Sequence, residues 1–136
     1  MMKLGRRLRL LGLCLSMPAA IAQTAAAAGA SDWFSGNYTK ARLIADGSDS
    51  AAIVAGLEIS LDDGWKTYWR TPGDAGGMAP SIDLKSSTNL KSAEVLFPAA
   101  HRFKDAAGES IGYKSAVVLP IRITAVDPGR PVELVA

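Results

Sequence analysis

Cysteine is nearly absent from this sequence of 136 residues, in which Cys14 is the only one. One thiol cannot form an intramolecular disulfide, so the predicted fold contains none. Histidine is as scarce, because His101 in "PAAHRF" is the only one. Zinc sites take three or four ligands, mostly from these two residue types, so no metal site is predicted. We expect His101 to lie in a loop and to form a hydrogen bond with a backbone group. The alternative is that His101 has a role in a surface contact.

Sequence motifs for catalysis are also missing. No serine stands in a Gly-x-Ser-x-Gly elbow, and the Gly-rich "PGDAGG" at 72–77 lacks the Lys-Ser/Thr of a phosphate-binding loop. Its Pro72-Gly73 pair instead fits the centre of a type II turn. Asp62 and Asp63 lie in a turn segment without the ligand spacing of a calcium loop. We therefore predict neither a catalytic residue nor a cofactor, and whether the chain is an enzyme stays open.

The N-terminus has the features of an export signal. Basic residues without an acidic one precede an apolar run at 10–21, and Ala20 and Ala22 are the small residues that a signal peptidase recognises. This run is shorter than the roughly 20 residues that a membrane-spanning helix needs. A twin-arginine signal and lipid attachment at Cys14 are alternatives that the flanking residues fit poorly. We predict a cleaved signal peptide at 1–22, a flexible lead-in at 23–37 and a periplasmic protein.

The net charge changes once this signal is removed. The whole chain has 15 basic and 13 acidic residues, but four of the basic residues lie in the signal. The remaining chain therefore has 11 basic against 13 acidic residues. No basic patch and no block of like charge remains that would indicate nucleic-acid binding.

Helical periodicity is almost missing, whereas two-residue alternation recurs. In "AAIVAGLEISLDD" the apolar residues from Ile53 to Leu61 stand at every second position, which predicts a half-buried strand. In "SAVVLPIRIT" the same spacing places Val117, Leu119, Ile121 and Ile123 on one face. Pro120 lies on the other face and cannot donate a hydrogen bond, so we expect it at a sheet edge or a bulge.

Weaker strand candidates and turn segments complete this pattern. The candidates are 38–45, 81–84, 93–97 and 132–135, and turns are expected at 46–50, 62–64, 71–77, 104–110 and 127–131. Six or seven short strands at regular spacing predict an all-β fold, an antiparallel β-sandwich. The alternation at 132–135 stops with the sequence, so this strand is either a short native terminus or the start of a longer one, in which case the sandwich is incomplete.

Aromatic residues concentrate in "GWKTYWRTPGDAGG", residues 64–77. If this stretch is extended, Trp65, Thr67 and Trp69 share one face, and Tyr68 lies on the other, between Lys66 and Arg70. Two tryptophans on the core face would each bury a large apolar area. Core packing is therefore the first interpretation. An exposed recognition surface, including a carbohydrate-binding one, is the alternative.

Four segments of the sequence together resemble a known family. They are "GWKTYWRTPGDAG", "SIDL", "VLFPAAHRF" and "IGYKSAVVLPIRI". In this order they are similar to the N-terminal periplasmic domain of DsbD-type thiol:disulfide interchange proteins, above all to exported DsbD-like relatives. The resemblance covers about residues 40–136 and implies an immunoglobulin-like β-sandwich at 38–136. The motif positions, which the resemblance implies to be scaffold, are Gly64, Trp65, Tyr68, Trp69, Pro72, Gly73, Asp74, Pro98, His101, Arg102, Gly112 and Tyr113.

In that family the domain carries a cysteine pair, which passes reducing equivalents from a membrane-embedded domain to periplasmic thiol proteins. Exchange needs a thiolate that attacks a disulfide, and residues 40–136 contain no cysteine. The resemblance implies that the pair follows the segment "DPGRPVELVA". We therefore expect the chain to be the N-terminal part of a longer family member or a truncated gene product. The implied partners are periplasmic thiol/disulfide proteins or a membrane-embedded electron-transfer domain, and the implied processes include cytochrome c maturation.

Two functional hypotheses follow. In the first, the chain is a DsbD-like domain that supports thiol–disulfide exchange in the complete protein and is inactive alone. In the second, it is a non-redox module that binds a periplasmic protein. Tyr68, Pro72, Gly73 and Asp74 are the candidate partner contact or cap, because Tyr68 is expected to face outward and the turn after it to lie beside a thiol site.

Overall fold

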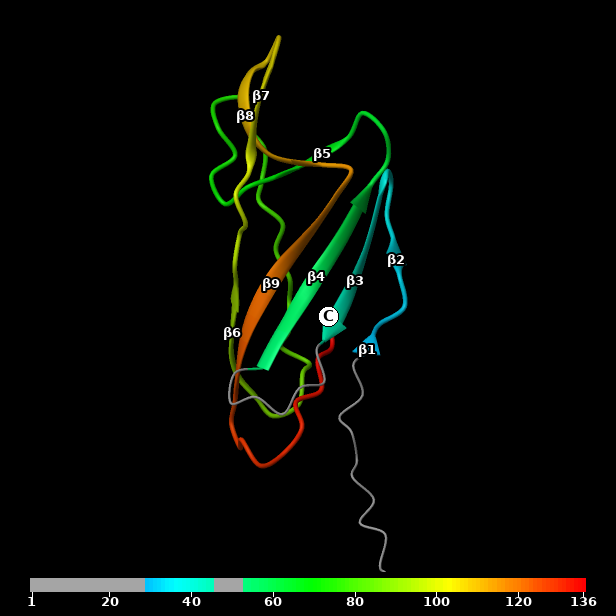
Figure 1. Cartoon of the computed structure of the whole chain (residues 1–136), viewed down its shortest axis with the longest axis vertical. Coiled ribbons are helices and arrows are strands. Elements are labelled where there is room, and N and C mark those ends of the chain that lie inside the picture. Colours follow the sequence, from blue (N-terminus) through cyan, green and yellow to red (C-terminus); the bar gives the residue numbers. More distant parts are fainter. Residues whose placement is uncertain (1–28, 46–52) are drawn as a thin grey trace, which may run out of the picture.

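The computed structural model describes residues 29–45 and 53–136, and every regular element in them is a β-strand (Figure 1). The described part thus contains no helix that could cross a membrane. The predicted signal peptide at 1–22 and the predicted turn at 46–50 lie outside the described residues. The strands are β1 (Gly29–Ala30), β2 (Phe34–Ser35), β3 (Thr39–Ala45), β4 (Ile53–Leu61), β5 (Lys66–Tyr68), β6 (Leu90–Val95), β7 (His101–Asp105), β8 (Gly108–Lys114) and β9 (Ala116–Ala125).

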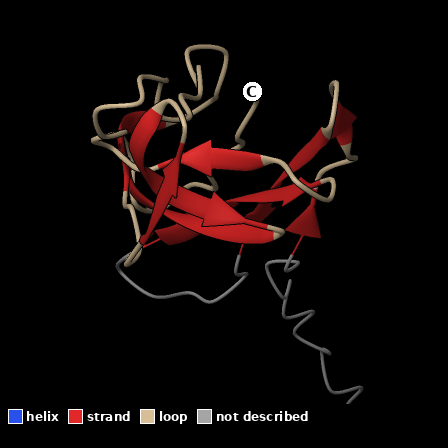
Figure 2. Ribbon diagram, turned by 90° about the horizontal axis from the view of Figure 1, so that it is seen from above, coloured by secondary structure: helices blue, strands red, loops and turns tan. Residues whose placement is uncertain are grey.

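The strands form two antiparallel sheets, joined by loops as Figure 2 shows from above. We call them the large sheet, with the order β1-β3-β4-β9-β6 and with β2 also paired to β3, and the small sheet, with the order β5-β8-β7. β8 runs almost directly into β9, so one turn carries the chain from the small sheet to the large one. The predicted antiparallel β-sandwich is confirmed.

Two-residue alternation places the core where the sequence predicts it. β4 pairs with β9 from Ile53 to Ser60, and Ala55 and Ile59 of β4 are buried. On β9, Leu119 and Ile121 have no exposed surface at all. Because successive side chains of a strand point to opposite faces, the residues between them lie on the outer face of the sheet. The predicted inward face of both strands is confirmed.

The small sheet covers only part of the inner face of the large sheet. There, Ile59 and Leu119 pack against Tyr113 of β8, with Trp69 beside them. The β5-β8-β7 sheet therefore supplies the second layer at one end of the molecule, which lies at the top of Figure 1.

Irregular chain covers the other part of that inner face. Ala55 and Ile121 pack there against Leu84, with Val132 and Leu134 next to them. The strands predicted at 81–84 and 132–135 are therefore wrong as strands, although their apolar side chains are in the core. Glu133 forms only an isolated bridge to Thr88, so these segments bury side chains without forming a ladder.

Other element boundaries also differ from the prediction. The predicted strand at 93–97 is β6, which begins three residues earlier at Leu90, and the one at 38–45 is β3. Two short strands, β1 and β2, lie within the predicted lead-in and pair with β3. The β7–β8 hairpin falls in a region where only a turn was predicted. Its strands carry many polar residues, so their alternation is weak in the sequence.

Pro120 is neither at an edge strand nor at a bulge, and that prediction is wrong. It lies in β9, between β4 and β6, opposite Gly56. Its carbonyl accepts a hydrogen bond from the Leu96 amide at 2.7 Å. Its nitrogen, which carries no hydrogen, points to the same side, toward Leu96. In antiparallel pairing both backbone groups of a residue point to the same neighbouring strand. The missing donor therefore costs no bond to β4, and it falls where β6 ends at Val95.

Truncation of the central core should test this arrangement. We expect Leu119→Ala to lower the free energy of unfolding by about 2–5 kcal/mol, because the side chain is fully buried and leaves a cavity. Thr124→Ala, on an exposed position of the same strand, should change it by less than about 0.5 kcal/mol. Urea denaturation of both variants measures the difference, and equal stabilities would contradict the assigned core.

Candidate functional site

The motif residues gather around the small sheet, and three of them form one row across it. Tyr68 of β5 and His101 of β7 both lie opposite Gly112 of the central strand β8. His101 is exposed and begins a strand, so the expected loop position is wrong. Its ring lies 6.4 Å from the ring of Phe103, measured between centroids.

The segment after β5 stays attached to β8 through backbone hydrogen bonds. The Trp69 amide donates to the Ile111 carbonyl at 2.9 Å, and the Ile111 amide donates to the Pro72 carbonyl at 2.7 Å. The Ala75 amide then donates to the Glu109 carbonyl at 3.0 Å. The 71–77 loop is therefore held along the edge of β8 at several points.

Gly73 allows this loop to approach β8 closely. Its φ of 96° lies in the region that the second central residue of a type II turn requires, as expected for the Pro72-Gly73 pair. A Cβ atom at Gly73 would lie 2.5 Å from the carbonyl oxygen of Glu109. The position thus needs glycine both for its backbone conformation and for lack of space.

Tyr68 is half-buried, because the end of the 71–77 loop lies against its ring. A Cβ atom at Gly77 would be 2.5 Å from Cζ of Tyr68, so the backbone of Gly77 touches the aromatic face. Asp74, between these two glycines, is exposed. The structure therefore brings Tyr68, Pro72, Gly73 and Asp74 into one surface region, although Tyr68 is less exposed than expected.

The two tryptophans of the motif have different environments, and the prediction that both face the core is wrong for Trp65. Trp65 is 47% exposed and stacks on Tyr38, with ring centroids 4.0 Å apart and planes at 8°. It precedes β5, so strand alternation does not decide its direction.

Trp69 packs against the core, as predicted. The guanidinium of Arg70 lies 4.3 Å from the centre of its ring. Its indole N–H is buried, and no hydrogen-bond partner is found for it in the described part of the chain. Trp69 therefore joins the small sheet to the core, whereas Trp65 lies outside it.

A polar cluster on the small sheet was missed by the sequence analysis. The Nζ of Lys66 donates hydrogen bonds to Asp105 Oδ2 at 2.8 Å and to Ser110 Oγ at 2.7 Å. The hydrogen bond from Lys66 lowers the pKa of the Asp105 carboxyl below its usual value. These residues come from β5, β7 and β8, so no local spacing in the sequence could have indicated the cluster.

This cluster is structural rather than nucleophilic. Ser110 has no exposed surface, and the Lys66 ammonium is held in an ion pair with Asp105. A nucleophilic serine needs access to substrate and a neighbouring base that can take its proton. Among the described residues no group of three or more His, Cys, Asp and Glu side chains could hold a metal ion. The cluster therefore ties strands β5, β7 and β8 together.

Two further motif contacts fix the hairpin. The Tyr113 hydroxyl donates to the Pro98 carbonyl at 2.8 Å, and burial raises the pKa of Tyr113 above its usual value. Arg102 of β7 forms an ion pair with Glu109 of β8. Tyr113 therefore ties the chain before β7 to the central strand of the small sheet.

Comparison with known proteins decides the family. The sequence profile of the family described as the N-terminal region of the thiol:disulfide interchange protein DsbD matches residues 40–136. The chain belongs to this family. The resemblance found in the sequence motifs is thus confirmed, and it accounts for the fold.

One solved structure similar to this DsbD N-terminal family domain is the N-terminal periplasmic domain of ScsB from Proteus mirabilis, with 32% sequence identity and a TM-score of 0.61. The match covers 74% of this chain and 41% of that one, so the chain spans less than half of the ScsB structure. No curated protein sequence matches. The match supports the immunoglobulin-like arrangement of the two sheets that the motifs implied.

Substitution of two glycines in the 71–77 loop should separate the energetic cost of a positive φ from the cost of a steric clash. Both Gly73 and Gly76 have positive φ, but a Cβ at Gly76 would meet nothing within 4 Å. We expect Gly76→Ala to lower the free energy of unfolding by about 1–2 kcal/mol through its backbone conformation. Gly73→Ala should lower it clearly more, because its Cβ would also displace the Glu109 carbonyl. Urea denaturation measures both, and equal losses would argue against the described loop path.

Alkaline pH should destabilise the domain through Tyr113. A raised pKa in the folded state means that stability is fully present below the usual tyrosine pKa of 10.0 and is lost as pH rises above it. We expect the thermal midpoint to fall more steeply above pH 10.0 than that of Tyr113→Phe. Thermal unfolding followed by circular dichroism tests this, and parallel pH profiles would contradict it.

Proposed function

We propose that this chain is a periplasmic DsbD-like domain, which supports thiol–disulfide exchange in the protein to which it belongs. The family match over residues 40–136 carries this proposal. The similar ScsB domain is described as periplasmic, and the export signal predicted at 1–22 agrees with that compartment. The partners in this proposal are periplasmic thiol/disulfide proteins or a membrane-embedded electron-transfer domain. Cytochrome c maturation is the process that we propose for the exchange.

The role of the matched region is to bind and to position, not to exchange electrons itself. Thiol–disulfide exchange passes through a mixed disulfide, and residues 40–136 contain no cysteine. Lys66, Asp105 and Ser110 hold the three strands of the small sheet together instead of serving a nucleophile. In this proposal, the reacting thiols are supplied outside the matched residues.

Tyr68, Pro72, Gly73 and Asp74 form the surface that would contact a partner or cap a thiol site. Its backbone is fixed before any partner binds, because Pro72 and Ala75 are bonded to β8. A fixed loop loses little conformational entropy on binding, which favours affinity. The Tyr68 ring and the exposed Asp74 would supply an aromatic contact and a carboxylate on this surface.

A second function, a non-redox module that binds a periplasmic protein, is favoured by one observation. The matched region has no thiol, so the same surface could act by binding alone. The two functions differ in their consequence for the cell, because only the first changes the redox state of other proteins.

Deletion of the gene in its host should distinguish the two functions. We expect at least one periplasmic protein to shift from its thiol to its disulfide form, because reducing equivalents no longer reach it. Trapping with a mass-tagged maleimide, followed by gel electrophoresis, measures this shift, and haem staining reports c-type cytochromes. Unchanged thiol states would contradict the first function and leave the binding module.

Complementation of the deletion tests the contact surface. Tyr68→Ala and Asp74→Arg should fail to restore the thiol form, whereas Tyr38→Ala should restore it. Tyr38 is a matched control because it is a partly exposed tyrosine that stacks on Trp65, away from the 71–77 loop. Immunoblots and thermal unfolding ensure that all variants are folded and equally abundant. Restoration by both Tyr68→Ala and Asp74→Arg would show that this surface is not used.

A further inference from the structure

The three tryptophans of the chain differ in one contact, an arginine placed on the indole ring. The guanidinium of Arg42 lies 4.4 Å from the centre of the Trp33 ring, and that of Arg70 lies 4.3 Å from the centre of the Trp69 ring. In the described part of the chain no arginine or lysine lies over Trp65 in this way. Trp65 is nevertheless the most exposed of the three, at 47%.

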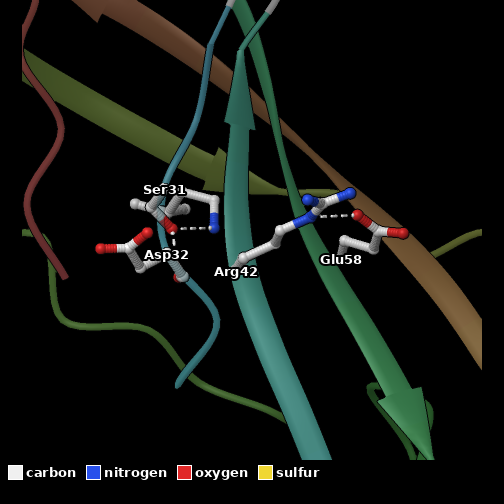
Figure 3. A network of polar contacts seen from close by, with 5 residues as sticks. Ser31, Asp32, Arg42 and Glu58 are labelled. Atoms are coloured by element: carbon white, nitrogen blue, oxygen red, sulfur yellow. Dashed lines mark hydrogen bonds and ion pairs between the residues drawn. The ribbon is translucent and has the colours of Figure 1, made fainter. Parts of the chain in front are cut away.

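The Arg42 contact shows how this molecule binds a guanidinium. Besides lying over Trp33, Arg42 Nε donates a hydrogen bond to Glu58 Oε2 at 2.7 Å, as Figure 3 shows. A guanidinium can stack on an aromatic ring through its face and bond a carboxylate through its edge, which an ammonium cannot do. An exposed tryptophan with a carboxylate beside it is therefore an arginine-binding pair in this fold.

The surroundings of Trp65 contain the same two groups without the arginine. Its ring stacks on Tyr38, which covers one face, and an exposed fraction of 47% leaves the other face open to solvent. Asp62 and Asp63 precede it in the turn that the Trp65 amide closes by donating to the Asp62 carbonyl at 3.1 Å. Both aspartates are exposed, and neither forms an ion pair with another described residue.

The backbone holds this aromatic stack in place. Tyr38 has a φ of 62°, a conformation that costs free energy for a residue other than glycine and persists only where the surroundings impose it. Here the Asp62 amide donates to the Tyr38 carbonyl at 3.0 Å, and the Gly36 amide donates to the Thr39 carbonyl at 2.9 Å. The stack is thus formed before any partner binds, so binding orders few further groups.

From this comparison we propose that an arginine of a partner protein stacks on the open face of Trp65, with Asp62 or Asp63 as its carboxylate. The partner then supplies to Trp65 what Arg42 supplies to Trp33. Tryptophan is the aromatic side chain that attracts a cation most strongly. Because the two aspartates add negative charge beside the ring, the surface favours a cation over an anion, and a neutral sugar would leave this charge unused.

This proposal does not rest on the proposed function, because it uses no residue of the 71–77 loop. In the complementation experiment above, Tyr38→Ala should restore the thiol form of the exchange partner. The same substitution should weaken the arginine contact, since Trp65 then loses the ring on which it stacks. The two proposals can therefore fail separately.

NMR of the isotope-labelled chain tests the contact with a defined probe, the peptide acetyl-Gly-Ser-Arg-Ser-Gly-amide. Three tryptophans give three indole N–H signals, and the signal missing from Trp65→Phe is that of Trp65. We expect the peptide to shift this signal and not the other two. Saturation should require millimolar peptide, since one exposed cation–π contact and one exposed ion pair each contribute little free energy. The same peptide with citrulline, which has the shape of arginine without its charge, should cause no shift.

Substitutions identify the two groups that bind the guanidinium. Trp65→Leu and the double variant Asp62→Asn with Asp63→Asn should each weaken binding by about threefold or more. The backbone amide signals of the turn at 62–65 measure the affinity in variants that lack the indole. Trp33→Leu is the matched control and should bind as the wild type does, because that exposed ring already carries an arginine. Circular dichroism checks that each variant is folded.

Several results would overturn the proposal. One is a Trp65 signal that does not move with millimolar arginine peptide, and another is equal binding by the wild type and both Trp65→Leu and the aspartate variant. A shift caused by the neutral sugar chitotriose but not by the arginine peptide would assign the stack to carbohydrate instead. A shift that grows with protein concentration in the absence of peptide would replace the partner protein by a second copy of the chain.

Discussion

The pairing of β4 with β9 is the constraint on which the rest of the structure depends. These two strands lie in the middle of the large sheet and supply Ile59, Leu119 and Ile121 to the core. The small sheet covers the inward side chains at one end of these strands. Irregular chain covers them at the other end. Since the same pairing also fixes the outward residues, it determines both faces of the sheet at once.

The small sheet is built by close backbone approach rather than by apolar packing alone. Gly112 has no room for a side chain because the Thr67 carbonyl lies directly over it, and Gly73 is confined in the same way by Glu109. Tyr113 and Trp69 then attach this sheet to the core. A surface held so closely is suited to presenting a fixed contact, which agrees with a domain that positions a partner rather than one that reacts.

The proposed function rests on the family of the chain and on the lack of cysteine in residues 40–136, and it assigns separate roles to the domain and to the thiols. In the proposed function, the domain provides the scaffold and a contact surface around Tyr68, and the reacting thiols come from elsewhere.

Alternation in the sequence by itself determined the all-β class and the inward faces of β4 and β9, because period-two patterning is a local property of a strand. The family was indicated by four motif segments, which can be read without the fold. Tertiary structure decided what depends on residues far apart in the chain. The sequence could not show that Pro120 is tolerated inside the sheet, because the reason is the end of β6 beside it. Trp65 lies outside the core because it stacks on Tyr38, and Lys66 finds its partners 39 and 44 residues away.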